Sequence, residues 1–264
     1  MMQSILAKLK EMTGKPHVQL TERGNKSINI ALDLAKQLDK TTVLIPDQAG
    51  WIYYKKAPKR FKLAIKEIKT SHGLIDLEDL EKNADENSVL LTCSMPGYFA
   101  VDNMQEIMKI CSKKACILIN DVSGAIGMDA AKIGHILVCS FGKWKPVNLE
   151  YGGFIATDDK KFYEGFDASY FDENKYADLL KRFDALPERM KKFDEKRKQV
   201  LEDLESFKII HADKAGINVI VKFDDDEIKQ RIIDYCAENN LEYTECPRYI
   251  RVNEKAISVE VKRL

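Results

Sequence analysis

The chain has 264 residues, with 42 basic and 42 acidic side chains and a formal net charge of zero. This balance excludes the strong global field that draws a protein to nucleic acid or to an anionic membrane, and we expect neither partner. Hydrophobic residues make up 45% of the chain, and no stretch approaches the about 18 apolar residues of a membrane span, so we expect a soluble protein.

The amino-terminal segment, residues 1–15, predicts a short amphipathic helix, because its apolar positions are interrupted by Lys8, Lys10 and Glu11. It lacks the uninterrupted apolar stretch of a secretion signal. The six cysteines form no CxxC pair, and most lie in or beside apolar runs, as small core residues do. Reduced thiols of this kind predict a cytoplasmic protein.

Continuously apolar, β-branched runs predict strands buried on both faces, at residues 41–45, 88–91, 115–119, 135–140 and 153–157. Apolar residues at helical spacing lie between these runs, at 27–38 and 101–111. Alternating strands and helices predict an α/β fold, a three-layer sandwich with a mostly parallel sheet and right-handed crossovers. We assign residues 1–165 to this major domain.

The composition of the sequence changes after residue 157. Residues 158–207 are rich in Lys, Asp and Glu with apolar residues at helical spacing, which predicts helices, and Pro187 is expected to start or break one. A strand at 217–223, a helix at 225–239 and two short strands at 249–252 and 257–262 follow. We therefore predict a helical linker and a small α+β C-terminal domain over residues 166–264.

Chemically active side chains follow two of the predicted strands. Ligands in open α/β sheets gather at the carboxyl ends of the strands. One strand ends at Asp121, and small residues including Ser123 follow it. The next ends at Ser140, with Lys143 and Lys145 close behind. A carboxylate and a lysine amine are therefore expected at one cleft.

These segments resemble the core of the fold-type I pyridoxal-phosphate enzymes, closest to the sugar-aminotransferase, or DegT-like, branch. In that branch a strand ends in Asp, the Schiff-base lysine lies five residues past a Ser that ends the next strand, and a Gly pair follows seven residues after the lysine. Asp121, Ser140, Lys145 and Gly152 reproduce this spacing. The resemblance covers residues 20–160.

The resemblance implies that the cofactor is pyridoxal 5'-phosphate, held by Lys145 as a Schiff base and paired at its ring nitrogen with Asp121. Elementary chemistry agrees, because an ionised carboxylate keeps the ring nitrogen protonated, and burial beside a cationic ring lets a lysine lose its proton. The resemblance also implies a cofactor site formed by Gly24, Asn25, Lys26, Ser123 and Ser140 with Trp51 stacked on the ring, and a substrate carboxylate bound by Arg251.

The expected function is an aminotransferase that acts on a small amino substrate, as the homodimer typical of the family. Lys143 is an alternative Schiff-base lysine, since other fold-type I branches place that lysine nearer the Ser. A lyase or desulfurase would use the same residues, and a non-catalytic regulatory protein is a further alternative. The chain departs from the branch at Gly142, where a His is common. The four histidines show no metal-ligand spacing, so no metal site is expected.

Overall fold

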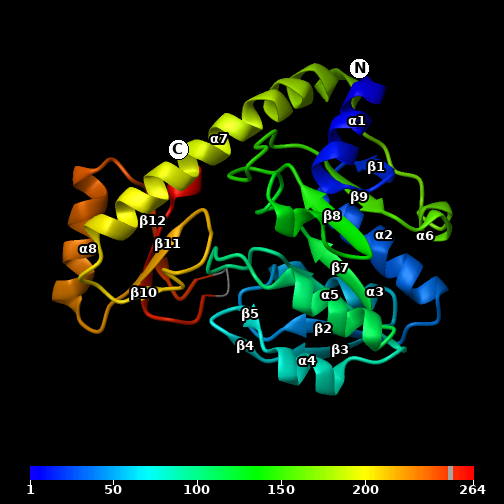
Figure 1. Cartoon of the computed structure of the whole chain (residues 1–264), viewed down its shortest axis with the longest axis horizontal. Coiled ribbons are helices and arrows are strands. Elements are labelled where there is room, and N and C mark those ends of the chain that lie inside the picture. Colours follow the sequence, from blue (N-terminus) through cyan, green and yellow to red (C-terminus); the bar gives the residue numbers. More distant parts are fainter. Residues whose placement is uncertain (249–251) are drawn as a thin grey trace.

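The computed structural model describes residues 1–248 and 252–264, which form a large and a small lobe (Figure 1). The large lobe is built on a seven-stranded sheet of order β1-β9-β8-β7-β6-β2-β3. Strands β2, β3, β6, β7 and β8 pair in parallel, whereas β9 is antiparallel to both of its neighbours. The strands are β1 (His17–Thr21), β2 (Thr42–Pro46), β3 (Ala64–Ile68), β6 (Ser88–Cys93), β7 (Ile117–Asp121), β8 (Ile136–Ser140) and β9 (Gly153–Thr157).

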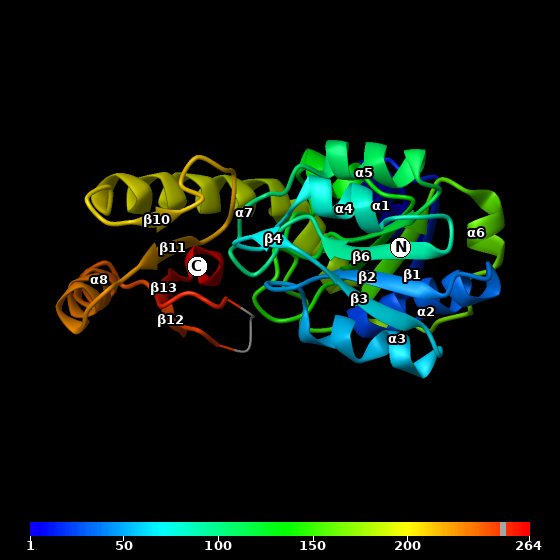
Figure 2. The ribbon, with the colours of Figure 1, turned by 90° about the horizontal axis from the view of Figure 1, so that it is seen from below.

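Helices cover both faces of this sheet, so the predicted three-layer α/β sandwich with a mostly parallel sheet is confirmed (Figure 2). Helices α2 (Gly24–Gln37) and α3 (Ala57–Arg60) lie on one face, and α4 (Leu77–Asn83) and α5 (Met104–Lys113) lie on the other. Successive residues of β7 point to opposite faces: Ile119 joins the cluster under α2, and Leu118 joins the cluster under α5. A strand with two buried faces needs this continuous apolar run.

The large lobe contains several further elements. Helix α1 (Met2–Thr13) confirms the predicted amino-terminal helix, and α6 (Lys160–Glu164) follows β9. A two-stranded hairpin is formed by β4 (Thr70–Ser71) and β5 (Leu74–Ile75), and two single turns are η1 (Ile52–Lys55) and η2 (Asp129–Lys132). In the described part of the chain, no helix has both the length and the apolar character needed to cross a membrane.

The small lobe follows a turn, η3 (Glu173–Lys175), and the long helix α7 (Tyr176–Asp203). Its antiparallel sheet has the order β10-β11-β13-β12, with α8 packed against it. The predicted strand at 249–252 falls mainly on residues outside the described part; among the described residues, β12 is an edge strand of this sheet. The elements are β10 (Ile209–Ile210), β11 (Val219–Lys222), α8 (Asp226–Glu238), β12 (Tyr243–Cys246), β13 (Ala256–Val259) and the final turn η4 (Val261–Arg263).

The expectation that Pro187 starts or breaks a helix is wrong. Pro187 lies inside α7, which continues for 28 residues. Its ring is exposed, while Phe183, Leu186 and Phe193 of the same helix are buried in the core. Burial of this apolar stripe outweighs the backbone hydrogen bond that the proline cannot donate.

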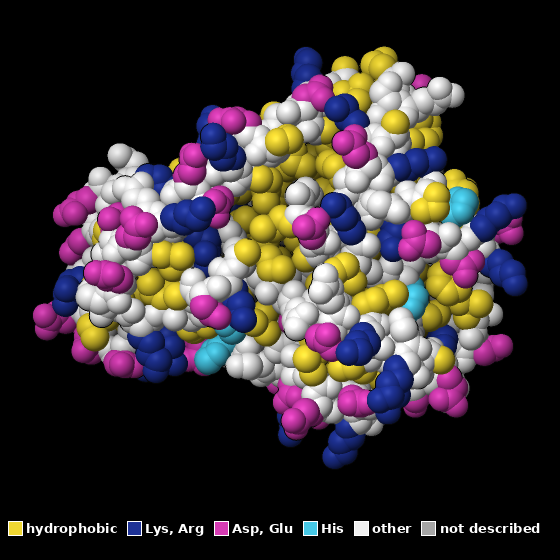
Figure 3. Space-filling view, viewed as in Figure 1, with side chains coloured by type: hydrophobic (Ala, Val, Ile, Leu, Met, Phe, Trp, Pro, Cys, Tyr) yellow, Lys and Arg dark blue, Asp and Glu magenta, His cyan; other side chains and the backbone are white. Residues whose placement is uncertain are grey.

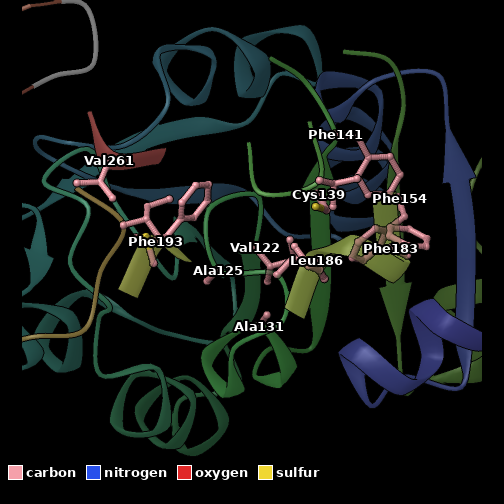
Figure 4. Close-up of a cluster of buried hydrophobic side chains, with 14 of the residues drawn as sticks. Val122, Ala125, Ala131, Cys139, Phe141, Phe154, Phe183, Leu186, Phe193 and Val261 are labelled. Atoms are coloured by element: carbon pink, nitrogen blue, oxygen red, sulfur yellow. The ribbon is translucent and has the colours of Figure 1, made fainter. Parts of the chain in front are cut away.

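One hydrophobic core joins the two lobes. It combines Phe141 and Phe154 beside the large sheet with Phe183 and Phe193 of α7 and Val261 of the final turn (Figure 4). In the space-filling view, hydrophobic side chains also gather in the hollow below α7 (Figure 3). The shared core fixes the position of the final turn relative to the large sheet.

Candidate active site

A cavity of about 380 Å³ lies at the carboxyl ends of β7 and β8. Asp121 and Ser140, the last residues of these strands, both line it, and Ile217 and Lys262 extend the lining into the small lobe. The cavity is therefore at the sheet edge where the sequence analysis expected chemistry.

Asp121 is held by two hydrogen bonds. The backbone N–H of Ser123 donates to Oδ1 at 3.0 Å, and the hydroxyl of Tyr54 donates to Oδ2 at 2.9 Å. Tyr54 is fully buried, and burial together with the charge of Asp121 raises the pKa of its hydroxyl well above the usual value. Tyr54 therefore stays protonated and keeps the carboxylate oriented toward the cavity.

Lys145 lies in the loop after β8 and reaches the same cavity as Asp121. Both charges act on the half-buried thiol of Cys93: after desolvation, Asp121 is the next largest cause that raises the pKa of Cys93, and Lys145 lowers it. The thiol of Cys139 responds in the same way. Asp121 and Lys145 therefore lie near the same two thiols and line the same cavity.

Lys143 also lines the cavity but differs from Lys145 in its surroundings. Its side chain is exposed, and Nζ lies 4.7 Å from the centre of the Trp144 ring. Lys145 is half-buried. Lys145 is therefore the better shielded from solvent of the two amines that reach the cavity.

The start of α2 and the end of β8 approach each other closely beside the cavity. A side chain on Gly24 would place its Cβ 2.5 Å from Cβ of Ser140, so only glycine fits there. Helix α2 has no side-chain cap, whereas Asn103 caps α5 and Asp225 caps α8. The first turn of α2 therefore presents backbone amides and its positive dipole end next to the Ser140 hydroxyl, a suitable setting for a phosphate.

Gly152 marks a second close approach, at the start of β9. Its backbone has φ +80°, and a Cβ there would lie 2.3 Å from the Phe171 ring. An isolated bridge joins Gly152 to Arg23, the residue before α2. The Gly pair noted in the sequence thus allows the helix start, β8 and β9 to meet.

The other predicted site residues are distributed as follows. Ser123 lines the cavity, and its Oγ accepts a hydrogen bond from the Ser140 backbone N–H at 2.8 Å. Trp51 and Asn25 line the rim, where Trp51 Nε1 donates to Asn25 Oδ1 at 3.1 Å. Lys26 lies in the first turn of α2 but outside the cavity lining. Arg251 lies outside the described residues.

The lining residues that the sequence did not predict include Tyr54, Cys93 and Lys262. Tyr54 follows Trp51 by one helical turn, and Cys93 ends β6 beside Asp121, so the rule of searching strand ends would have found the thiol. Lys262 carries no local signal, because the tertiary fold alone brings the final turn to the cavity.

The residues fit pyridoxal phosphate. Gly24, where there is no room for a Cβ, and the uncapped start of α2 suit the phosphate. Asp121, which accepts two hydrogen bonds, suits the ring nitrogen. The half-buried Lys145 suits the aldehyde carbon. Once bound, the cofactor would supply an electron sink for chemistry at the carbon that bears an amino group. The protein supplies the orientation and the proton transfers.

Comparisons with known proteins give two family matches. Residues 2–169 match the DegT/DnrJ/EryC1/StrS aminotransferase family, and residues 174–264 match the MJ1341 family C-terminal domain. No curated protein matches the chain significantly.

Solved structures share the fold at low sequence identity. A 3-amino-5-hydroxybenzoic acid synthase has 15% identity and a TM-score of 0.76, and the match covers 99% of this chain and 85% of that one. GDP-4-keto-6-deoxy-D-mannose-3-dehydratase of E. coli, solved with bound hydrated PLP, has 13% identity and a TM-score of 0.76, over 97% and 86%. A sugar aminotransferase from Micromonospora echinospora has 14% identity and a TM-score of 0.75, over 98% and 86%.

Proposed function

We propose a function from the premise that this chain belongs to the DegT/DnrJ/EryC1/StrS aminotransferase family. The protein is a pyridoxal-phosphate-dependent aminotransferase that removes an amino group from one small molecule and transfers it to another. The observation that carries this proposal is that Asp121 and Lys145 line one cavity, and that the start of α2, which suits a phosphate, lines the same cavity.

Each residue has a distinct part in this function. Asp121, oriented by Tyr54 and Ser123, holds the proton on the ring nitrogen by charge pairing. Lys145 is the residue that would attach the cofactor covalently, and its Nζ, once displaced by the amino substrate, would take up the substrate's α-proton as a general base. The Ser140 hydroxyl and the Gly24–Asn25 amides bind the phosphate, with Lys26 nearby at the start of the same helix. Trp51 covers the ring, and Arg251 remains a proposed substrate-carboxylate residue.

We also propose that the protein acts as a homodimer in the cytoplasm. Trp51 and Ile52 support the dimer, because these large apolar side chains are 41% and 37% exposed, and Trp51 lines the cavity, so a partner chain would cover them beside the site. The six cysteines are all free thiols, which supports a reducing compartment. The two family matches, which end at 169 and begin at 174, support a boundary near residues 165 and 166.

Chemical trapping tests the attachment site directly. Reduction of the cofactor-loaded protein with borohydride, followed by peptide mass mapping, should place the cofactor mass on Lys145. The K145A variant should lose the label, and K143A should keep it, which separates the two neighbouring lysines. A label on Lys143 would overturn the assignment, and a wild-type protein that takes up no cofactor would overturn the proposed function.

Spectral titration of the loaded protein with a panel of amino acids tests the reaction type. A donor should convert the cofactor to its amine form, with release of the matching keto acid in equal amount. Release of ammonia or sulfide from the donor instead would assign the protein to the lyase or desulfurase reaction on the same residues.

A further inference from the structure

Trp144 has an unusual backbone conformation between the two lysines of the loop after β8. Its φ is 61°, in the left-handed region that a bulky residue rarely adopts. Side chains two residues apart point the same way in an extended chain, but here Lys143 is exposed and Lys145 is half-buried. The left-handed residue between them therefore gives the two amines different surroundings, although both line the cavity.

Two contacts hold Trp144 in this conformation. Its backbone N–H donates to Oδ1 of Asn148 at 2.7 Å. The centre of its ring lies 4.2 Å from the guanidinium carbon of Arg263, in η4. A left-handed backbone costs free energy in a residue with a side chain, and it persists only where neighbouring groups impose it. The first of these contacts is local to the loop, whereas the second comes from the small lobe.

Arg263 is itself fixed by the small lobe. Its side chain is 15% exposed, and Nη1 lies 2.8 Å from Oε2 of Glu242. Nη2 donates to Oγ1 of Thr244, in β12, at 3.2 Å. The turn η4 contacts α7, and Figure 1 shows it in red beside that helix. The guanidinium group is therefore held in place by contacts that do not involve the Trp144 ring.

The stack of Arg263 on Trp144 can select between conformations of the loop. An indole is the best aromatic partner for a guanidinium group, and the attraction strengthens as water is excluded from the pair. Nζ of Lys143 lies 4.7 Å from the centre of the same ring, so the indole also holds the neighbouring amine. A ring fixed by Arg263 therefore keeps Lys143 at the indole and leaves Lys145 as the half-buried amine of the cavity.

We propose that Arg263 is a positioning residue that acts through Trp144: it holds the loop after β8 in the conformation that presents Lys145, and not Lys143, to the cofactor. This inference rests on the proposed function, in which one lysine attaches the cofactor. It assigns the choice between two lysines of one loop to a residue of the small lobe. Arg263 is not among the described residues that line the cavity, so its effect passes through its neighbour.

The distribution of a trapped label between the two lysines tests the proposal. Pyridoxal phosphate is added to cofactor-free protein, the product is reduced with borohydride, and fragment-ion mass spectrometry measures the ratio of label on Lys145 to label on Lys143. Because it is a ratio, it does not depend on the total amount of label. The control is R231M, since Arg231 lies 5.0 Å from the centre of the Phe207 ring in the small lobe, away from the cavity. The test variants are R263M, R263K, W144F and W144A.

The label ratio should fall about 10-fold in R263M, the size expected for a cation–π pair that is shielded from water. R263K keeps the charge but lacks the planar guanidinium group, so its ratio should fall less. W144F keeps an aromatic ring and should fall less than W144A, which should fall as far as R263M. R231M should match wild type, because it removes a stack of the same kind that does not contact the loop.

The fluorescence of cofactor-free protein provides a second readout. The chain has two tryptophans, so a W51F background leaves Trp144 as the reporter. Adding R263M to this background should shift the emission to longer wavelength, because the indole loses the side chain that covers it. Adding R231M should leave the emission unchanged.

An R263M label ratio equal to that of wild type would overturn the proposal, as would an equal fall in R231M. If R263M does not fold, as judged by circular dichroism, W144A decides from the other side of the stack, and a wild-type ratio in W144A would overturn the proposal. A wild type that takes up no label would refute the proposed function. Label on Lys145 in wild type together with Trp144 emission that R263M leaves unchanged would refute this inference alone.

Discussion

Replacing Tyr54 with Phe tests the geometry that orients Asp121. The variant removes a single hydroxyl, which donates to Asp121 Oδ2 at 2.9 Å from a fully buried ring, and leaves the shape of the core unchanged. A hydrogen bond to a charged group contributes roughly 1.5–3 kcal/mol, more than a bond between neutral groups. We therefore expect the free energy of unfolding of the cofactor-free protein to fall by that amount.

The neighbouring Tyr53 provides a matched control. Its hydroxyl donates to Oδ1 of Asn29 at 3.0 Å and accepts a hydrogen bond from Arg60, in a half-buried position away from the cavity. Tyr53→Phe should lower the stability by about 0.5–1.5 kcal/mol, because its acceptor, Asn29, is neutral and its hydrogen bond from Arg60 is exposed to solvent. Urea denaturation of both variants measures the difference. If both variants lose the same free energy of unfolding, the hydrogen bond from Tyr54 to Asp121 does not have the strength of a bond to a charged group.

Three further predictions concern the frame around the site. Pro187→Ala should raise the stability by roughly 1–3 kcal/mol, measured by urea denaturation, because an exposed proline inside α7 lacks a helix hydrogen bond. Phe193→Ala should lower the stability by about 3–5 kcal/mol, because this ring is 1% exposed in the shared core; a loss below about 1 kcal/mol would mean that the lobes do not depend on it. Burial raises the pKa of Asp102 from 3.8 to about 6, so the folded protein binds this proton more tightly than the unfolded chain, and the contribution of Asp102 to the stability should fall by about 3 kcal/mol as the pH rises from about 4 to 6. Asp102→Asn should remove that slope in thermal denaturation followed across this pH range, and an unchanged slope would contradict the assignment.

The central strands were predictable because burial on both faces requires a continuous run of apolar residues, which is visible in the sequence. A strand such as β7 is covered by helices on both faces, so it must be apolar throughout, and its end marks the sheet edge where Asp121 lies. Edge strands carry a weaker signal. In β3 the charged residues Lys66 and Glu67 interrupt the apolar pattern, and β1 contains Gln19, so both strands were missed.

The site was predictable where its residues follow strands in the sequence. Asp121, Ser140 and Lys145 fall into this group, because the sheet alone brings strand ends together. Tyr54 and Lys262 reach the cavity through the packing of a turn and of the small lobe, and no local pattern encodes such contacts. Pro187 was misread for a related reason, since tertiary burial of α7 overrides the local preference of proline.

The pairing of β1 with β9 sets an order for the maturation of the protein on the ribosome. His17 pairs with Thr157, so the first strand of the sheet has no partner there until most of the large lobe has been synthesised. The Arg23–Gly152 bridge, which positions the start of α2, has to wait as well. Such distant contacts slow folding, and we expect nascent chains that stop before β9 to remain unable to bind the cofactor.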